Sequence, residues 1–407
     1  MNIRWPRFYG WTITITLGIT TTISYGVMLY AYTVFAVPMS RDLGWSLTTL
    51  NGGYSLMLLV AGLLARPVGA WVDRHGSRLL MTLGSVLAVV AVLAWSKVAD
   101  IRTYYLVAFL IGVASAATFY EPAFTTVTQW FRRDRPKALL VVTIIAGFAS
   151  TIFLPLSGWL DGRYGWRQAL VILAILLGVT TIPLHAIVLR RRPEDLGLLP
   201  DGDTIPSDAS TISPDLDGST LDHALRDAGF WWLGGAFWFA NLVSIGLGVH
   251  ALALLTARGE SPQLAATIVG LIGAAQVLAR IGVTLLGQRI SLIGATAVAF
   301  VCQAVAAALL LIHGNWLPII AAILLLGAGR GAITLLRADL VADRYGRAHF
   351  GAINGAFALM IVTSAAAAPI GIGVLADTWG NDLAVATMVV VALASSGLLW
   401  LAARDPV

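Results

Sequence analysis

The chain has 407 residues, of which 58% are hydrophobic and only 12% charged, and its net charge is +5. A soluble globular domain carries about 25% charged residues, so the composition excludes such a domain and indicates a polytopic membrane protein. The positive charge is no sign of nucleic-acid binding, because the basic residues fall in short loops between apolar runs. A single cysteine, Cys302, excludes an intramolecular disulfide and a thiolate metal site.

Twelve apolar runs are long enough to cross a bilayer, which takes roughly 17–25 residues. The first run, at 8–37, is too long for the apolar core of a cleavable leader, so we expect it to remain as a spanning helix. The other runs predict spans at 50–72, 79–96, 103–130, 138–160, 168–189, 229–257, 263–288, 290–312, 316–341, 350–375 and 382–402. The sequence therefore predicts an all-α membrane protein with twelve transmembrane helices.

A polar stretch separates the sixth span from the seventh. Residues 193–228 are rich in Asp, Ser, Pro and Gly, a composition that cannot bury a core. Within it, STLDHALRD predicts a short helix capped by Ser219 or Thr220. We therefore expect two pseudo-symmetric six-helix bundles, at 1–190 and 229–407, joined by a linker at 191–228.

The basic residues predict how the helices are oriented, because cytoplasmic loops are enriched in lysine and arginine. Most of the 26 lysines and arginines lie in loops on the same side as the N-terminus. The sequence therefore predicts that both termini and the linker are cytoplasmic. As a separate expectation, we assign the chain to a bacterial inner membrane.

The two halves share a short repeated stretch. LLARPVGAWVDRHGSR (63–78) aligns with VLARIGVTLLGQRISL (277–292), and the alignment pairs Arg66 with Arg280. Repetition at half the chain length, with six spans on each side of a polar linker, is typical of a transporter built from two duplicated bundles.

The stretch GAWVDRHGSR (69–78) resembles the signature G-x-x-x-D-R-x-G-x-R that lies between spans two and three of the major facilitator superfamily. The resemblance implies the major facilitator fold and a cytoplasmic gate. In that gate the acid faces a helix N-terminus of the other half, where an anion is favoured, and the arginines pair across the bundle interface. The gating residues would be Gly69, Asp73, Arg74, Gly76 and Arg78. In the second copy Gly287 and Gln288 stand at the positions of the acid and the arginine, so only one gate is complete.

A narrower resemblance, to bacterial monocarboxylate porters and the oxalate/formate antiporter group, rests on FYGWTIT (8–14), WFRRDRPKAL (130–139) and RRRPEDLGLLPDG (190–202). That group holds the substrate carboxylate with an arginine in span eight, and Arg280 matches it. Animal monocarboxylate carriers have an acid four residues before this arginine, where this chain has Gln276. They also have a lysine in span one, which Met28–Tyr30 lack. Their proton scheme therefore does not carry over.

Three arginines lie well inside predicted spans, away from their ends, where an ionisable group must face a cavity or a partner. The planar guanidinium of Arg280 matches a carboxylate, which predicts substrate contact; the alternative is a structural bond to neighbouring carbonyls. Arg330, between the glycines of GAGRG, is a second candidate for anion binding, or a partner of Glu121. Arg66, followed by a proline, is expected to serve the gate or to reach the membrane interface.

Two further titratable residues within the spans are candidates for handling a proton. Glu121, in ATFYEPAFTT near mid-membrane, is the predicted proton carrier of the first half, and the alternative is a fixed ion pair with Arg66. Pro122 has no N–H to donate, so a helix kink is expected beside this carboxyl. His250, near the outer end of span seven, is either a proton relay or a structural donor.

Aromatic residues also lie on spans one, four and seven, which line the central cavity in the superfamily that this chain resembles. They would either stack on a planar substrate or serve in packing. They are Tyr25, Tyr30, Phe119, Tyr120 and Trp238.

The leading hypothesis is a secondary transporter that moves a small organic anion, a monocarboxylate, with a proton by alternating access. The alternatives are uptake of a planar flavin- or nucleobase-like nutrient, proton-driven drug efflux, and a nutrient sensor with the transporter fold. Efflux is disfavoured, because exporters carry G-P-x-x-G-G in span five, whereas Leu154 precedes Pro155 here and only Gly158 follows. The sequence has no metal-ligand cluster, phosphate-binding loop or nucleophile–base spacing, so we expect no enzyme activity, no cofactor and no ATP drive. We expect a monomer with no nucleic-acid partner.

Overall fold

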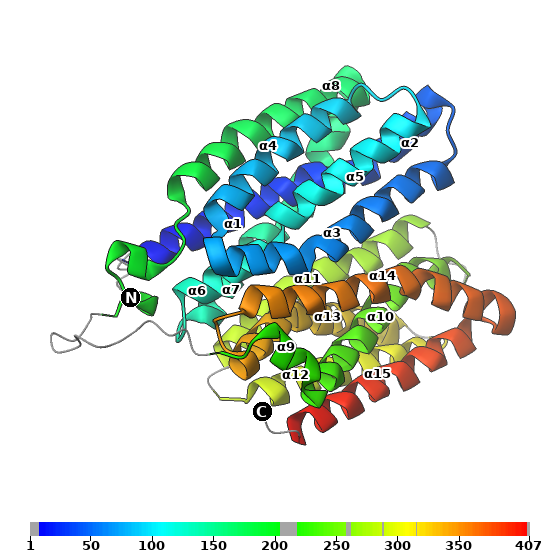
Figure 1. Ribbon diagram of the computed structural model, residues 1–407. Coiled ribbons are helices and arrows are strands. Elements are labelled where there is room, and N and C mark those ends of the chain that lie inside the picture. The colour runs from blue at the N-terminus through cyan, green and yellow to red at the C-terminus, as the bar shows by residue number, and fades with distance from the viewer. Residues whose placement is uncertain (1–7, 204–217, 258–261, 287–288, 315, 405–407) are drawn as a thin grey trace, which may run out of the picture. The chain divides into compact units, whose positions relative to one another are not determined.

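The computed structural model describes residues 8–203, 218–257, 262–286, 289–314 and 316–404, which are helical in nearly all of their length (Figure 1). The chain divides into two compact units. Unit 1 comprises Met1–Ser219 and Tyr345–Leu359, and unit 2 comprises Thr220–Arg344 and Met360–Val407. The gate positions of the second copy, Gly287 and Gln288, lie outside the described residues. The predicted partition into bundles at 1–190 and 229–407 with a linker at 191–228 stays a prediction.

Unit 1 contains the helices of the first six predicted spans. They are α1 (Tyr9–Tyr25), the π-helical turn η1 (Gly26–Tyr30), α2 (Ala31–Leu43), α3 (Leu47–His75), α4 (Ser77–Trp95), α5 (Ile101–Thr118), α6 (Tyr120–Trp130), α7 (Arg135–Gly147) and α8 (Ala149–Val188). Two 3-10 turns follow, η2 (Pro193–Leu196) and η3 (Pro200–Gly202). Unit 1 also includes the first ten residues of α14, Phe350–Leu359.

Unit 2 begins with the short helix α9 (Leu221–Arg226). The hydroxyl of Thr220 accepts a hydrogen bond from the His223 amide at 3.2 Å, so the predicted cap is confirmed. The longer helices of unit 2 are α10 (Ala228–Ala257), α11 (Pro262–Leu286), α12 (Leu292–Leu310), α13 (Trp316–Tyr345), the remainder of α14 (Phe350–Trp379) and α15 (Asn381–Arg404).

Ten stretches of the described residues are long and apolar enough to cross a membrane. One of them, Arg135–Val188, covers both α7 and α8, and the backbone of α8 turns at Gly165 (φ 75°, ψ 159°) into two passes. The shorter apolar helix Phe350–Ala365 lies in the predicted span eleven. These two additions account for the twelve predicted passes, and the all-α membrane fold is confirmed.

Two local breaks shape the spans that carry the predicted site. Helix α3 ends and α4 begins at Gly76, whose φ of 78° is a left-handed conformation that favours glycine. Helices α5 and α6 meet at Phe119, which has an extended backbone (φ −85°, ψ −158°). Pro122 lies in the first turn of α6, where its missing N–H is tolerated. The kink expected beside Glu121 is therefore confirmed.

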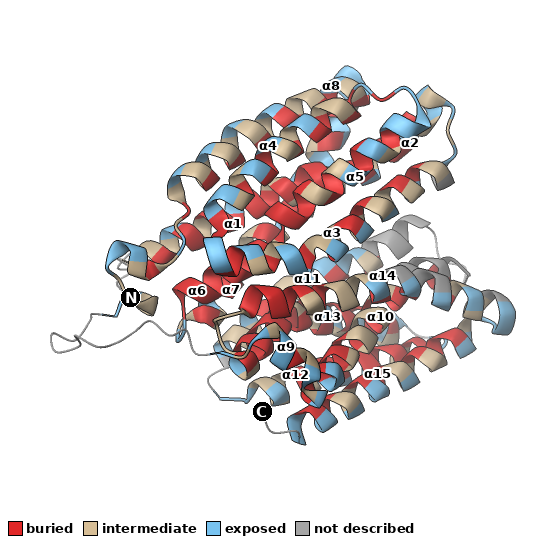
Figure 2. Cartoon of the chain, in the orientation of Figure 1, coloured by how far each residue is buried: buried red, intermediate tan, exposed pale blue. Residues whose placement is uncertain are grey.

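The faces of the unit 1 helices differ in burial, as expected for helices that pack on one side and meet lipid on the other. Residues Pro122–Trp130 of α6 are all buried, whereas α8 exposes large apolar side chains (Figure 2). Among these, Ile175, Val179 and Ile187 are 57–65% exposed. A hydrocarbon environment suits such residues better than water does.

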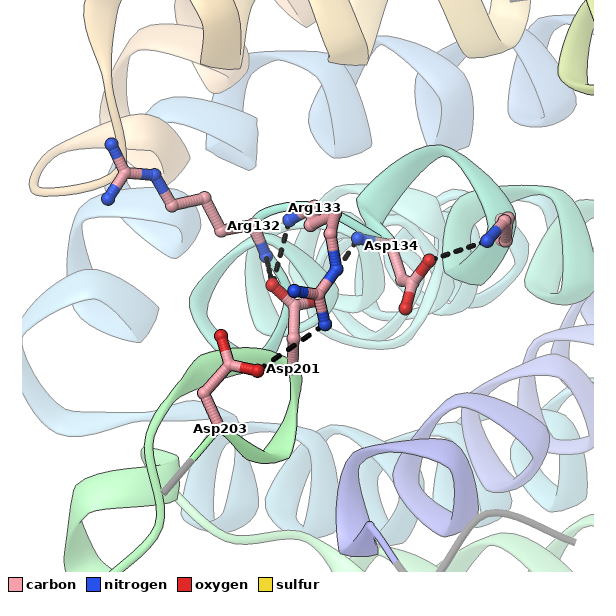
Figure 3. Close-up of polar contacts among 6 residues, drawn as sticks. Arg132, Arg133, Asp134, Asp201 and Asp203 are labelled. Carbon is pink, nitrogen blue, oxygen red and sulfur yellow. Dashed lines mark hydrogen bonds and ion pairs between the residues drawn. The ribbon is translucent and has the colours of Figure 1, made fainter. Parts of the chain in front are cut away.

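Hydrogen bonds within unit 1 join the start of the predicted linker to the loop between α6 and α7 (Figure 3). The Asp201 carboxylate accepts hydrogen bonds from three successive backbone amides: Oδ2 from Arg132 and Arg133 at 3.1 and 2.8 Å, and Oδ1 from Asp134 at 3.0 Å. These amides directly precede α7, so Asp201 supplies the acceptors that a helix start lacks. Asp201 has a φ of 63°, a conformation that Asp tolerates better than most residues do.

We expect Asp201→Asn to lower the free energy of unfolding by about 1 kcal/mol, because an amide has one acceptor oxygen and no charge. Asn tolerates the same backbone conformation, so the substitution tests the carboxylate alone. The matched control is Asp203→Asn, because Asp203 pairs with Arg133 at 3.4 Å in an exposed salt bridge. Thermal unfolding of the purified protein, followed by tryptophan fluorescence, should show a lower Tm for the first variant only. Equal Tm values for both variants would contradict this account.

Candidate functional site

Two of the predicted gate residues, Gly69 and Asp73, meet the first turn of α14. Asp73, in the last turn of α3, is only 3% exposed. Its Oδ1 accepts a hydrogen bond from the Gly351 amide and its Oδ2 one from the Ala352 amide, both at 3.0 Å. The first amides of a helix have no partner within it and carry partial positive charge, so a carboxylate is favoured there. This is the contact that the motif resemblance implies, and the gating role itself stays a prediction.

Small residues on both helices allow this contact. A Cβ built at Gly69 would overlap the carbonyl group of Gly351, and one built at Gly355 would overlap that of Ala65. Residues 65 and 69 of α3 and residues 351 and 355 of α14 are each one turn apart, so the two helices cross with their backbones in contact. Small residues at such spacing are the usual means of close helix packing in membranes.

An arginine beside this crossing binds the end of a neighbouring helix. Arg347, just before α14, donates hydrogen bonds to the carbonyls of Thr128 and Gln129 near the C-terminal end of α6. Burial lowers the pKa of the Arg347 guanidinium, while the carboxylates of Glu194 and Asp201 act in the opposite direction. A cation at a helix C-terminus is favourable.

The remaining arginines of the motif act locally. Arg78 donates a hydrogen bond to the carbonyl of Ala186 on α8 at 2.6 Å, within unit 1. Arg74 is exposed. The carbonyl of Asp73 accepts a hydrogen bond from Arg192 at 3.3 Å, which the motif did not predict.

Glu121 contacts the same turn of α14 as Asp73 does. Its Oε2 accepts a hydrogen bond from the side-chain amide of Asn354, which is completely buried. The alternative ion pair with Arg66 is not formed: Arg66 is exposed, and among the described residues it makes no salt bridge with a carboxylate. Asn354 is thus a site residue that sequence reasoning missed, although an amide inside the predicted span 350–375 was a signal for it.

The aromatic residues predicted for the cavity in unit 1 pack on one another at the break between α5 and α6. Tyr25 stacks on Phe119 with ring centroids 3.9 Å apart and contacts Tyr120 at 5.0 Å. Tyr120 in turn stacks on Phe124. Tyr30, in the π-helical turn, is partly buried and is not one of these contacts. The cluster thus packs the kink that carries Glu121.

The predicted residues of unit 2 lie on three helices. Arg280 on α11 is 7% exposed, whereas Arg330 on α13 is exposed. A Cβ at Gly331 would overlap the backbone of Gln276, so Gly331 brings α13 against α11 one turn from Arg280. Trp238 on α10 is partly buried and donates a hydrogen bond to the Thr363 hydroxyl on α14 at 3.0 Å.

His250, predicted as a relay or a structural donor, has one clear partner. Its Nε2 lies 3.0 Å from the Asn381 Oδ1 at the start of α15. The bond links α10 and α15 near one end of unit 2, which is what a structural donor does.

The comparison with known families decides what this chain is. The family model described as the Major Facilitator Superfamily matches residues 17–357. The chain belongs to the Major Facilitator Superfamily. It is therefore a multi-pass membrane transporter and not an enzyme.

The proteins to which this chain is similar include some that are named as carriers of anions. The chain is 24% identical over 169 residues to "Monocarboxylate transporter 13" of Bos taurus (41% of this chain, 39% of that protein). It is 29% identical over 181 residues to "Probable nitrate/nitrite antiporter NarK1" of Thermus thermophilus (39% and 38%). The chain thus spans about two fifths of the length of these relatives. The crystal structure of the human organic anion transporter MFSD10 (TETRAN) aligns with a TM-score of 0.70 at 15% identity, covering 96% of this chain and 99% of that chain.

We expect Gly69→Ala to destabilise this facilitator by about 1–3 kcal/mol, because the added methyl would force α3 and α14 apart. The matched control is Gly162→Ala on α8, where a Cβ would meet nothing within 4 Å. Alanine in a helix is otherwise preferred over glycine, so the control should not be less stable. Thermal unfolding in detergent measures both variants. An unchanged Tm for Gly69→Ala would show that the crossing is not tight.

Proposed function

We propose that this facilitator is a secondary transporter that moves a small organic anion, a monocarboxylate, together with a proton across a bacterial inner membrane, with both termini cytoplasmic. The observation that carries the proposal is the burial of Arg280, which is 7% exposed on the otherwise apolar helix α11. A charge inside a membrane span is costly by several kcal/mol and marks a pathway or a binding site. A guanidinium offers a carboxylate two parallel hydrogen bonds, which lysine cannot.

The names of the relatives support an anionic substrate. A monocarboxylate transporter, a nitrate/nitrite antiporter and an organic anion transporter all move small anions by name. Tyr30, Tyr120 and Trp238 are proposed as further substrate contacts, because they lie on spans one, four and seven, which line the cavity in this superfamily. Arg330 is proposed as a further contact because it is a second guanidinium within a span.

Glu121 is the proposed proton carrier. It is a carboxyl within the candidate span Ile101–Trp130, at a break where α6 begins, and the side-chain amide of Asn354 donates a hydrogen bond to it. A neutral amide can serve both forms of a carboxyl group, because its N–H donates to the ionised form and its oxygen accepts from the protonated form. Asp73 and its motif, with Gly69, Arg74, Gly76 and Arg78, are proposed as the gate that alternates access between the two bundles.

Ligand-induced stabilisation of the purified protein tests the substrate class. Binding to the native state raises the apparent stability in proportion to ln(1 + [L]/Kd), so a panel of monocarboxylates, flavins and nucleobases is screened by thermal shift. We expect a monocarboxylate to raise the Tm of the wild type, and Arg280→Lys to weaken that binding at least tenfold through loss of the bidentate geometry. The control is Arg163→Lys, an exposed arginine on α8. A flavin or nucleobase that binds independently of Arg280 would overturn the anion proposal in favour of a planar nutrient.

We expect Glu121→Gln to keep the fold, because glutamine retains an oxygen that accepts the Asn354 bond, and to remove the pH dependence of transport. The measurement is uptake of the identified anion into proteoliposomes across a series of external pH values at fixed membrane potential. The Arg163→Lys variant serves again as the reference for expression and reconstitution. An unchanged pH profile in Glu121→Gln would show that the proton binds elsewhere.

A further inference from the structure

The bond between Glu121 and Asn354 joins the proposed proton carrier to the helix that the proposed gate holds. Asn354 donates its side-chain N–H to Glu121 Oε2. It lies two residues after Ala352, whose amide binds Asp73. Thr125, one turn after Glu121, packs against Gly351 of the same turn, since a Cβ at Gly351 would lie 2.7 Å from its methyl group. One turn of α14 therefore carries bonds to both carboxylates.

The other end of the Asn354 amide is the second observation. Its Oδ1 is buried and has no hydrogen-bond partner within the described residues, although Asn354 is 0% exposed. Buried acceptors without a partner are unfavourable and rare in folded proteins. This oxygen belongs to the same amide whose N–H binds Glu121, so it can accept a hydrogen bond from that carboxyl group if the amide rotates.

The N–H and the oxygen of the Asn354 side-chain amide can bind different protonation states of Glu121. An ionised carboxylate only accepts hydrogen bonds, so it uses the Asn354 Nδ2–H, as the structure shows. A protonated carboxyl has an O–H to donate, and a half-turn of the amide presents Oδ1 to it. The main-chain amides that bind Asp73 have no such second mode, because an N–H only donates.

We infer that Asn354 is the positioning residue of the proton step: it holds Glu121 in both protonation states and transmits the change to the first turn of α14. This inference rests on the proposed role of Glu121 as the proton carrier. Protonation exchanges a charge-assisted hydrogen bond for a neutral one of about half the strength. Of the two carboxylates, only Asp73 then keeps charge-assisted hydrogen bonds to the first turn of α14. Proton uptake by Glu121 therefore weakens the attachment of this turn.

Other titratable groups set a background that the test leaves unchanged. The elements packed against α6 and this turn carry, among others, Arg66 and Asp73 on α3, Tyr25 on α1, Arg135 on α7, and Arg347 and His349 before α14. None of them is altered when Asn354 is substituted, so a change in proton response is assigned to the amide.

The test replaces Asn354 by leucine, which has a similar size but neither donor nor acceptor. Loss of the bond to the ionised form favours proton binding, so the midpoint of the pH profile of transport should move upward by about one unit or more. The control is Asn241→Leu, an amide that donates to the Ile361 carbonyl and the Ser364 hydroxyl with no carboxylate involved. It should leave the midpoint unchanged. Asn354→Ser, whose hydroxyl both donates and accepts, should restore part of the shift and serves if the leucine variant does not fold.

Two substrate-free readouts separate this inference from the proposed function. The carboxyl stretching band of protonated Glu121, identified by its absence in Glu121→Gln, is titrated by infrared difference spectroscopy of the purified protein. The protection factors of the amides at 350–355, which are exchange rates corrected for the pH dependence of intrinsic exchange, should fall as that band appears in the wild type, and should not respond to pH in Asn354→Leu. No band lost in Glu121→Gln would refute the proton assignment itself. A band that titrates at the same pH in Asn354→Leu, with unchanged exchange at 350–355, would overturn the role of Asn354 alone.

Discussion

A carboxylate withdrawn from water needs donors, and the first amides of a helix need acceptors. Unit 1 meets both needs in one contact, between Asp73 and the start of α14. The contact requires two backbones to touch, which explains glycine at positions 69 and 351. It also requires α3 to end sharply, and Gly76 provides that turn with a φ of 78°. The residues of the motif that serve this contact therefore depend on one another and do not act independently.

The same turn of α14 makes a second contact, through the side chain of Asn354 instead of the main chain. The amides bound to Asp73 belong to the main chain and are fixed in direction, whereas the Asn354 side chain can offer either a donor or an acceptor. The start of α14 is thus bound in two ways: the contact with Asp73 does not depend on the proton, and the contact between Asn354 and Glu121 responds to it. Such a combination suits a transporter, in which gate and coupling ion must act together. The kink at Phe119 and Pro122 is what turns Glu121 toward Asn354.

Close helix contact through glycine recurs in unit 2. Gly327 and Gly331 of α13 bring that helix against the backbone of α11 near Ile272 and Gln276. Lipid is as apolar as the helix surfaces, so helices in a membrane gain little from hiding apolar residues, and tight packing takes over as the source of association. In both units the residues proposed to bind ions lie beside such crossings, where the backbone is held most firmly.

The sequence by itself determined the apolar spans, the all-α class, the Thr220 cap and the kink at Pro122, because each depends on residues within a few turns of one another. The family signature was equally local, and it correctly pointed Asp73 at a helix start. Only the tertiary structure decided that this start belongs to α14, that Glu121 meets Asn354 rather than Arg66, and that Asp201 holds the loop before α7. Glu121 and Asn354 lie 233 positions apart, and periodicity within one helix carries no information on which face of another helix it will meet. That choice depends on how the helices pack, and small residues and buried polar groups settle it together.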